Sequence, residues 1–341
     1  MTRIAPVSRA WLAQVTEEVL DPERPIIDPH HHLWKRGLGF DYMLEDFWQD
    51  TDTGHNIVKT VFMECHAFYD KMAPEHLRSL GETRAIAAVA QQSARNERGH
   101  PPVAALVSHV DLSLAGESEQ LLRDVIRQHL ESGAGYLRGF RHAGAHDKKS
   151  GQFFISPNGP SYLYGKESFR QGIKVLADLT LTTDTWHYHH QNQDFHELAR
   201  ALPECIMVLD HFGTPLGVDV YAGCRDVIFQ QWKEDIREIS RCPNVYAKLG
   251  GLAMPDNGFG WHLRKLPPDS DEFVRSQKAY YLHTIECFGP DRCMFESNFP
   301  MDRYSISYQV LWNGFKKMVA DFTEQEKHAL FYGTAEQVYR L

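Results

Sequence analysis

The sequence has few cysteines, and their spacing excludes several classes of protein. Its 341 residues include six cysteines, and none of them forms a C-x-x-C pair, which argues against a zinc knuckle or a disulfide framework. We therefore expect a reducing compartment, namely the cytoplasm. No apolar run approaches the roughly 18 residues of a transmembrane helix, and the N-terminal stretch lacks the continuous apolar segment of a signal peptide.

Positive charge is also scarce. The formal net charge of -9 argues against a general nucleic-acid partner, so the expected partner is a small molecule. An anionic substrate is still possible, because a local cluster of arginines can attract it despite the negative net charge of the chain. No G-x-G-x-x-G follows a strand-like run, which removes the main support for a dinucleotide-binding fold. A homo-oligomer is only the general default.

Strand-like runs alternate with helix-like segments along most of the chain. Eight such units in series predict a parallel sheet closed into a (β/α)8 TIM barrel rather than an open doubly wound sheet. We expect one barrel domain over residues 25–341, a helical N-terminal extension over residues 1–24, and a long loop over residues 254–273 after the seventh strand. The expected strands are Pro25–His32, Ile57–Cys65, Val103–Val110, Tyr136–His142, Leu179–Trp186, Cys205–His211, Asn244–Gly250 and Arg292–Asn298.

Chemically useful side chains gather where these strands end. Active sites of such barrels lie at the carboxyl ends of the strands, so this convergence predicts an active site. The strand ends are His30–His32, Glu64–His66, His109–Asp111, Arg138–His142, Asp184–His187, Asp210–His211, Lys248 and Glu296–Asn298.

The stretch "IIDPHHHLW" carries the best candidates for metal ligands. Strand alternation puts His30 and His32 on one face and His31 on the other. Two imidazoles two residues apart can hold one zinc, manganese or iron(II) ion. The alternative is a hydrogen-bonded polar strand end without a metal. His189, just beyond the fifth strand, is the candidate third ligand.

Several other strand-end residues are candidates for catalysis. We expect His211 to be a further ligand or a general base, with Asp210 pointing outward. Glu64 and Asp184 are alternative bases.

The substrate would meet a separate group of side chains. Arg138 or Arg141 would capture a substrate carboxylate, since arginine binds carboxylates in a bidentate manner. Lys248 would serve similarly or pair with a buried acid. His66 is a further binding residue, and Trp186 with the loop from Met254 would cover a ring.

Five stretches together resemble the amidohydrolase-2 family, in the branch of metal-dependent hydrolases that holds sugar lactonases and pyrone-dicarboxylate lactonases. They are "IIDPHHHLW", "RGFRHA", "VLDHFGTPLG", "AKLGGL" and "DRCMFESNFPMD". The resemblance implies a (β/α)8 barrel with His30 and His32 at the metal site when a metal is used. It also implies that His211 assists metal binding or proton transfer.

The chain departs from the family pattern at the eighth strand. The family's Ser-Asp-Trp-Pro, whose aspartate activates the attacking water, is replaced by Ser297-Asn298-Phe299-Pro300. Asn298 is neutral and cannot be a general base, although its oxygen could bind a metal weakly or accept a hydrogen bond. Glu296, two residues earlier, could supply the missing carboxylate or form a buried pair with Lys248 or an arginine.

The expected function is a metal-assisted hydrolase that opens a lactone or related cyclic ester bearing a carboxylate. Zinc is the expected metal, manganese is the alternative, and a metal-free site is a third reading. A non-oxidative decarboxylase of an aromatic or unsaturated acid is the second enzyme hypothesis, because it tolerates Asn298 better. A non-catalytic small-molecule binding protein is the third hypothesis.

Overall fold

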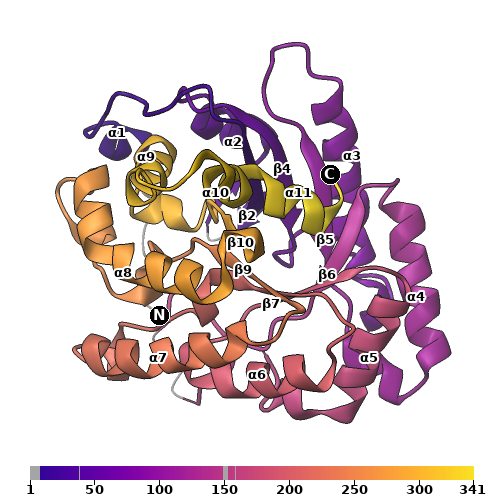
Figure 1. Cartoon of the computed structure of the whole chain (residues 1–341). Helices are drawn as coiled ribbons and strands as arrows, with labels where there is room; N and C mark the ends of the chain where they lie inside the picture. The colour runs from indigo at the N-terminus through magenta and orange to yellow at the C-terminus, as the bar shows by residue number, and fades with distance from the viewer. Residues whose placement is uncertain (1–7, 38, 149–152, 158) are drawn as a thin grey trace.

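Eight parallel strands form one sheet in which each strand pairs with the next along the chain (Figure 1). The computed structural model describes residues 8–37, 39–148, 153–157 and 159–341. The predicted barrel is confirmed, and each expected strand is present with its ends shortened by zero to three residues. The strands are β1 (Ile26–His31), β4 (Ile57–Met63), β5 (Val103–Ser108), β6 (Leu137–Arg141), β7 (Thr182–Thr185), β8 (Met207–Leu209), β9 (Val245–Leu249) and β10 (Cys293–Phe295). A separate hairpin consists of β2 (Trp34–Gly37) and β3 (Phe40–Tyr42).

The barrel closes between its first strand and the segment that follows its last. His31 and Phe299 form an isolated parallel bridge. The backbone N–H of His32 donates to the Phe299 carbonyl at 2.7 Å, and that of Asn298 donates to the His30 carbonyl at 2.9 Å. The closing seam therefore runs through the histidine stretch and the departure from the family pattern.

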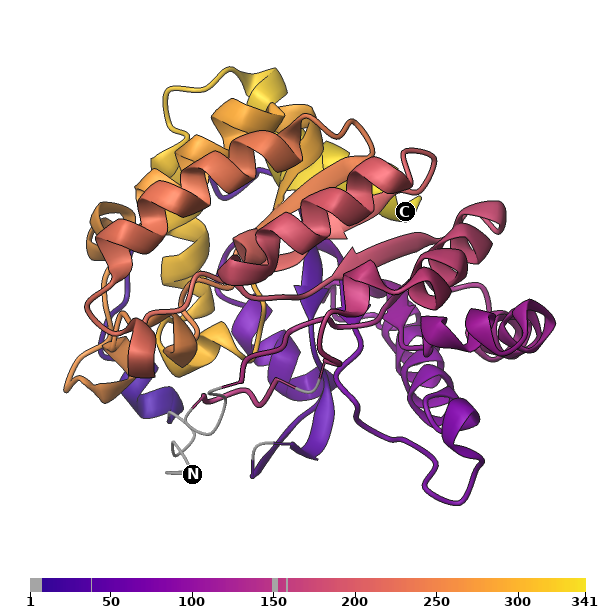
Figure 2. The ribbon, with the colours of Figure 1, turned by 90° about the horizontal axis from the view of Figure 1, so that it is seen from below.

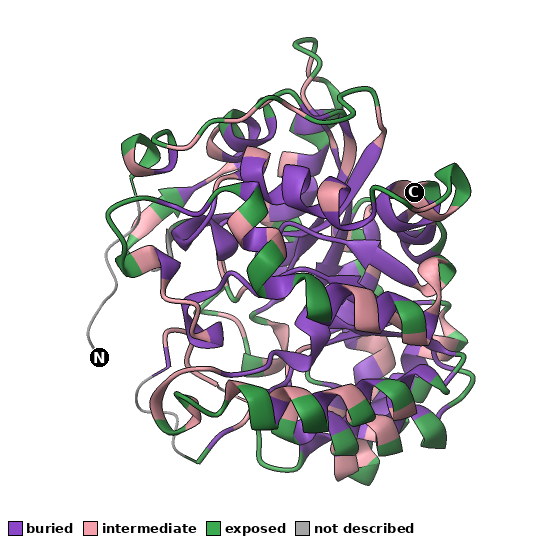
Figure 3. Ribbon diagram, turned by 60° about the vertical axis from the view of Figure 1, so that its left-hand side comes forward, coloured by how far each residue is buried: buried purple, intermediate pink, exposed green. Residues whose placement is uncertain are grey.

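Helices form an outer layer around the strands (Figure 2). Strands and inward helix faces are buried, while exposed residues mark the outward faces (Figure 3). The helices are α1 (Arg9–Leu12), α2 (Leu44–Thr51), α3 (Leu80–Ala94), α4 (Glu119–Ser132), α5 (Glu167–Asp178), α6 (Asn192–Ala201), α7 (Arg225–Ser240), α8 (Ser270–Phe288), α9 (Tyr308–Met318), α10 (Glu324–His328) and α11 (Thr334–Tyr339).

Helix α4 illustrates how the sequence sets these elements. The Ser118 side chain accepts a hydrogen bond from the N–H of Leu121 and so caps the first turn, and Gly133 follows the last residue. Leu122, Val125 and Ile126 recur at helical spacing and are buried against the barrel. The apolar stripe thus fixes which face of the helix covers the sheet.

The barrel interior has an apolar half and a polar half. Short apolar side chains, including Ile27, Val61, Ala105 and Val208, pack with α11, whose Tyr339 is fully buried among them. Helix α11 lies at the amino ends of the strands, where Arg340 donates to the Arg138 carbonyl. Because this end is plugged, access to the polar half is from the carboxyl ends.

The expected loop over residues 254–273 and the expected N-terminal segment lie on the outside of the barrel. Residues 254–273 hold two short 3-10 helices, Pro255–Asn257 and Trp261–Leu263, and the start of α8. The indole of Trp11 donates to the Arg264 carbonyl, so the N-terminal segment packs on this loop. The domain boundary at residue 24 stays a prediction. Among the described residues, no helix is long and apolar enough to cross a membrane.

Candidate active site

A β-bulge sets the direction of the three histidines on β1. The pairing of β1 with β4 shifts register between Asp28 and His31, around Pro29, which has no N–H to donate to the ladder. His30 and His32 consequently face the barrel interior, and their Nε2 atoms lie 3.3 Å apart. His31 points outward, as predicted, where its ring stacks on Phe47 at 4.1 Å.

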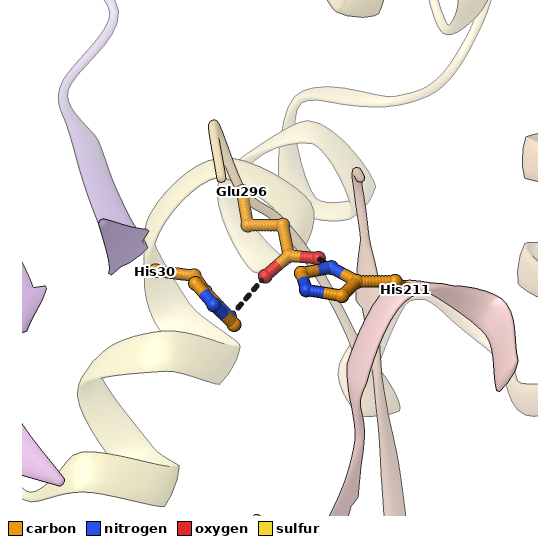
Figure 4. A group of neighbouring side chains, drawn as sticks. All are labelled: His30, His211 and Glu296. Carbon is orange, nitrogen blue, oxygen red and sulfur yellow. Dashed lines mark hydrogen bonds and ion pairs between the residues drawn. The ribbon is translucent and has the colours of Figure 1, made fainter. Parts of the chain in front are cut away.

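Glu296 joins two of the site histidines. It follows β10 directly, and its carboxylate lies between the rings of His30 and His211 (Figure 4). His211 Nδ1 donates to Glu296 Oε1 at 2.6 Å, and His30 Nδ1 forms an ion-pair contact of 2.8 Å with Oε2. A carboxylate behind Nδ1 leaves the Nε2 lone pair of His211 available, as for a general base or a metal ligand.

The side chain of Arg141 is engaged within the protein. Its guanidinium contacts Glu64 Oε1 at 2.8 Å and Asp210 Oδ2 at 3.1 Å, and it also donates to the Glu64 carbonyl. Burial alone would raise the pKa of Glu64, but Arg141 lowers it to about 2. Burial lowers the pKa of His32 to about 3, and the nearby charge of Arg141 is the second-largest cause of this shift. The His32 imidazole is therefore neutral at working pH. Glu64 is therefore a poor base, and Arg141 is a structural cation.

A second buried cation lies deeper in the barrel. Lys248 Nζ is 2.8 Å from Asp184 Oδ2 and 3.2 Å from Asp210 Oδ1, and the Tyr339 hydroxyl donates to Asp184 at 2.6 Å. Burial opposes the charge of Lys248, but the two aspartates raise its pKa overall. Lys248 and Asp184 thus pair with each other, which leaves Asp184 no freedom to act as a base.

The charges of the site leave room for a cation. Two cations, Arg141 and Lys248, face four carboxylates, namely Glu64, Asp184, Asp210 and Glu296. With all four carboxylates ionised and the buried His30 and His32 neutral, these groups carry two negative charges in excess, which a divalent ion would neutralise.

The donor set fits a metal. Among the described residues, His30, His211 and Glu296 form the one group of metal-binding side chains whose ligand atoms lie within 4.8 Å of one another. His32 Nδ1 donates to the Met63 carbonyl at 2.8 Å, which leaves the lone pair of the neutral ring on Nε2, the atom that faces His30 Nε2. Two nitrogen ligands of a tetrahedral zinc lie about 3.3 Å apart, given bonds of about 2.0–2.1 Å, and the His30–His32 separation matches this.

The expected outward direction of Asp210 is wrong. Strand β8 ends at Leu209, and a tight turn follows in which His211 and Phe212 have φ values of 54° and 58°. Strand alternation does not extend into this turn. Asp210 and His211 therefore both reach the site, where Asp210 contacts Arg141 and Lys248.

A cavity of about 610 Å³ opens beside these groups. Its polar wall includes His32, Glu64, His66, Arg141, His211 and Asn298. Its apolar wall includes Trp34, Phe68, Tyr69, Ile155, Trp186 and Met254. The volume suits a small organic molecule, and the mixture of aromatic walls and a few polar groups is typical of a ligand site.

Two of the expected site residues lie elsewhere. Arg138 donates to the carbonyls of Gly135 and Leu137, at the amino end of β6 and away from the cavity. His189 Nδ1 accepts from the Leu216 N–H, and its ring packs against Tyr221 outside the group of ligand atoms.

Sequence reasoning missed cavity residues that lie just beyond the ends of two barrel strands. Trp34 and Lys35 come from β2, and Phe68, Tyr69 and Lys71 come from the loop after β4. Strand-end analysis does not extend into these segments, although the aromatic and basic side chains close to two strand ends were a usable signal. Of the loop after β9, Met254 contributes to the cavity wall.

Breaking the Glu64–Arg141 pair should destabilise the fold. Glu64→Gln leaves the buried Arg141 undercompensated, and we expect a loss of about 3–5 kcal/mol in the free energy of unfolding at neutral pH. Because the pKa of folded Glu64 lies below its unfolded value, this stabilisation is present above that value and is lost as the pH falls through about 2. Urea unfolding across a pH series measures both effects.

The control is an exposed pair. Glu45→Gln, which removes the partner of Arg98 on the surface, should cost less than about 1 kcal/mol. Equal losses for the two variants would contradict the structural role of the buried pair.

Comparisons with known proteins show the family of this chain. The family model for amidohydrolases matches residues 27–341. An uncharacterized protein of Sinorhizobium fredii is 28% identical, over 93% of this chain and 98% of its own length. The L-fucono-1,5-lactonase of Burkholderia multivorans is 23% identical, over 92% of this chain and 96% of its own length.

Solved structures share the fold. An amidohydrolase from Burkholderia multivorans with bound zinc superposes with a TM-score of 0.69 at 23% identity, over 93% of this chain and all of its own. A 5-carboxyvanillate decarboxylase from Novosphingobium aromaticivorans with bound manganese superposes with a TM-score of 0.57 at 12% identity, over 94% of this chain and 97% of its own.

Proposed function

The chain belongs to the amidohydrolase family, and we propose that within this family of hydrolases it is a lactonase that opens the ring ester of a small, carboxylate-bearing molecule. The observation that carries the proposal is the His211–Glu296 pair, whose hydrogen bond of 2.6 Å prepares an imidazole in the cavity wall as a base. This pair supplies a proton acceptor where the neutral Asn298 cannot.

The proposed reaction uses His211 twice. Its Nε2 accepts a proton from water while the water oxygen bonds to the lactone carbonyl carbon. The ring carbon–oxygen bond then breaks, and His211 returns the proton to the departing oxygen, which yields a hydroxy acid. Glu296 holds the ring and stabilises the imidazolium between the two steps, as the acid of a catalytic triad does.

We assign the metal site to His30 and His32, with zinc preferred and manganese as the alternative. A bound divalent metal would polarise the ester carbonyl or the attacking water. The protein's own share is to keep both imidazoles neutral through burial, which lowers their pKa values, and to direct their Nε2 atoms to one point. His189, the candidate third ligand of the sequence analysis, takes no part in this assignment.

A panel of lactones tests the proposal. Purified protein is incubated with lactones that carry a free carboxylate, their methyl esters and a neutral sugar lactone, and acid release is followed with a pH indicator. Ring opening at least a thousandfold above the buffer rate supports a lactonase. Aromatic and unsaturated acids are assayed in parallel for carbon dioxide, whose release without any ring opening would establish the decarboxylase alternative instead.

The substrate anion should be held at the cavity rim. Arg141 is engaged by Glu64 and Asp210, whereas Lys35 and Lys71 are exposed and line the cavity. We expect Lys35→Ala with Lys71→Ala to raise KM for a carboxylate-bearing lactone about tenfold, which corresponds to about 1.4 kcal/mol of attraction lost. Steady-state kinetics at low and high salt measure this, since salt screens exposed charges.

The controls for this prediction are an uncharged substrate and a lysine far from the cavity. KM for the methyl ester should stay unchanged in the double variant, and Lys278→Ala, on the exposed face of α8, should leave both substrates unaffected. Equal losses for the charged and the neutral substrate would refute anion capture by these lysines.

A further inference from the structure

Asn298 occupies a constrained position beside the metal-capable group. It follows β10, has a φ of 54°, and is 1% exposed, and its backbone N–H donates to the His30 carbonyl at 2.9 Å. It is nevertheless one of the residues that line the cavity. The backbone of Asn298 is therefore held in place at the wall of the cavity.

Asp302 fixes the orientation of the Asn298 amide. Asn298 Nδ2 donates to Asp302 Oδ1 at 3.1 Å, while the N–H groups of Ala253 and Gly251 also donate to the Asp302 carboxyl group. Burial, together with the nearby charge of Glu296, raises the pKa of Asp302 well above its usual range, and these three donors offset only part of that shift. Two backbone N–H groups donate to this carboxyl group, and the Asn298 amide meets it through its nitrogen, so the amide oxygen faces away from Asp302.

The amide oxygen lacks a donor. Asn298 Oδ1 is buried and has no hydrogen-bond partner among the residues that the structure describes. A buried acceptor without a donor costs free energy, which a ligand hydrogen bond recovers. His211 lines the same cavity as Asn298, and its ring packs on Gly251, whose N–H also reaches Asp302: a Cβ at Gly251 would lie 2.4 Å from His211 Nδ1.

We propose that Asn298 Oδ1 is the second acceptor for the attacking water and that Asp302 is the positioning residue that turns this oxygen toward it. The inference rests on the proposed hydrolysis. Water has two protons. His211 Nε2 removes one of them. Asn298 Oδ1 accepts a hydrogen bond from the other, which stays bonded to the water oxygen throughout the step. With both protons directed, the oxygen lone pair of the water is aimed at the substrate carbonyl carbon.

This assignment divides the work of the family's aspartate between two pairs. The His211–Glu296 pair takes the proton, and the Asn298–Asp302 pair orients the nucleophile. A neutral residue suffices for orientation, which accounts for an asparagine at the end of the eighth barrel strand.

Kinetics of three variants test the proposal. We expect Asn298→Ala to lower kcat about a hundredfold with KM changed less than threefold. Asp302→Asn should lower kcat at least tenfold, because an amide at position 302 pairs with either end of the Asn298 amide and the orientation is lost. The exchange Asn298→Asp with Asp302→Asn restores a donor–acceptor pair of reversed polarity. It should recover kcat to within tenfold of the wild type and add an acidic limb to its pH profile.

The remaining outcomes are decided by structure and metal content. A crystal structure of the wild type should contain a water within 2.6–3.2 Å of both Asn298 Oδ1 and His211 Nε2, and Asn298→Ala should lack it; this measurement does not depend on a substrate. Unchanged kcat in Asn298→Ala, or the absence of that water, overturns the proposal. Loss of bound metal in Asn298→Ala also overturns it, because Asn298 would then be a ligand. If the wild type has no lactonase activity but its crystal structure contains the ordered water, the proposed function is wrong and the assignment of Asn298 as a water-orienting residue stands.

Discussion

Replacing His211 with alanine is expected to lower kcat about a thousandfold and to change KM less than threefold. General base catalysis contributes about a hundredfold to ten-thousandfold, and the two carboxylates expected as alternative bases are both held in buried ion pairs. Glu64 is tied to Arg141, which together with its surroundings lowers its pKa to about 2, and Asp184 is tied to Lys248. Initial rates with the best lactone of the panel give both constants.

Two further variants separate the base from its support. Glu296→Gln should lower kcat about ten- to hundredfold, because the ring stays hydrogen-bonded but its protonated form loses the carboxylate. His328→Ala, at an exposed histidine on α10, should have no effect. If His211→Ala lost bound metal in proportion to activity, His211 would be a ligand rather than the base.

Removing the histidine pair of β1 is expected to abolish metal binding. Wild-type protein should carry about one equivalent of zinc or manganese, and His30→Ala with His32→Ala should carry less than a tenth of that, with kcat reduced at least a thousandfold. The reason is that the two Nε2 atoms, 3.3 Å apart, are the ligands whose spacing fits a single tetrahedral ion. Elemental analysis after gel filtration, followed by back-titration with zinc, measures the stoichiometry.

The matched control is the histidine that the sequence suggested as a third ligand. His189→Ala should retain the metal, because its ring lies with Tyr221 and Leu216 outside the ligand group. A wild type that is fully active with less than a tenth of an equivalent of metal, and remains so after chelation, would establish a metal-free hydrolase.

The barrel and part of its site could be predicted because they follow from local rules. Alternating strand and helix patterns mark the eight units, and the carboxyl ends of parallel strands must meet at one end. Alternation also gave the relative directions of His30, His31 and His32 correctly, although the register shift between Asp28 and His31 falls in the same stretch. Features that depend on contacts between residues far apart in the chain were harder to predict from the sequence.

Asp210 and Arg141 illustrate that limit. Alternation fails for Asp210 because the strand stops one residue before it, and the turn that follows is held by tertiary contacts. Arg141 was expected to bind substrate, yet it pairs with two carboxylates that follow β4 and β8. Arg141 and Glu64 are 77 residues apart, and no local sequence pattern predicts such a pair. Glu296 was recognised as a substitute carboxylate through its spacing from Asn298, but its bridge between two histidines needs three strands in place.

The closing seam of the barrel has a consequence for the order of events during synthesis. His30 leaves the ribosome early, whereas Glu296 and Asn298, which contact it through side chain and backbone, emerge more than 260 residues later. Until then the histidine pair lacks both its carboxylate and the strand segment that fixes it in register. The proposed metal site is therefore incomplete on a nascent chain, and we expect an ion to bind it only after the barrel has closed.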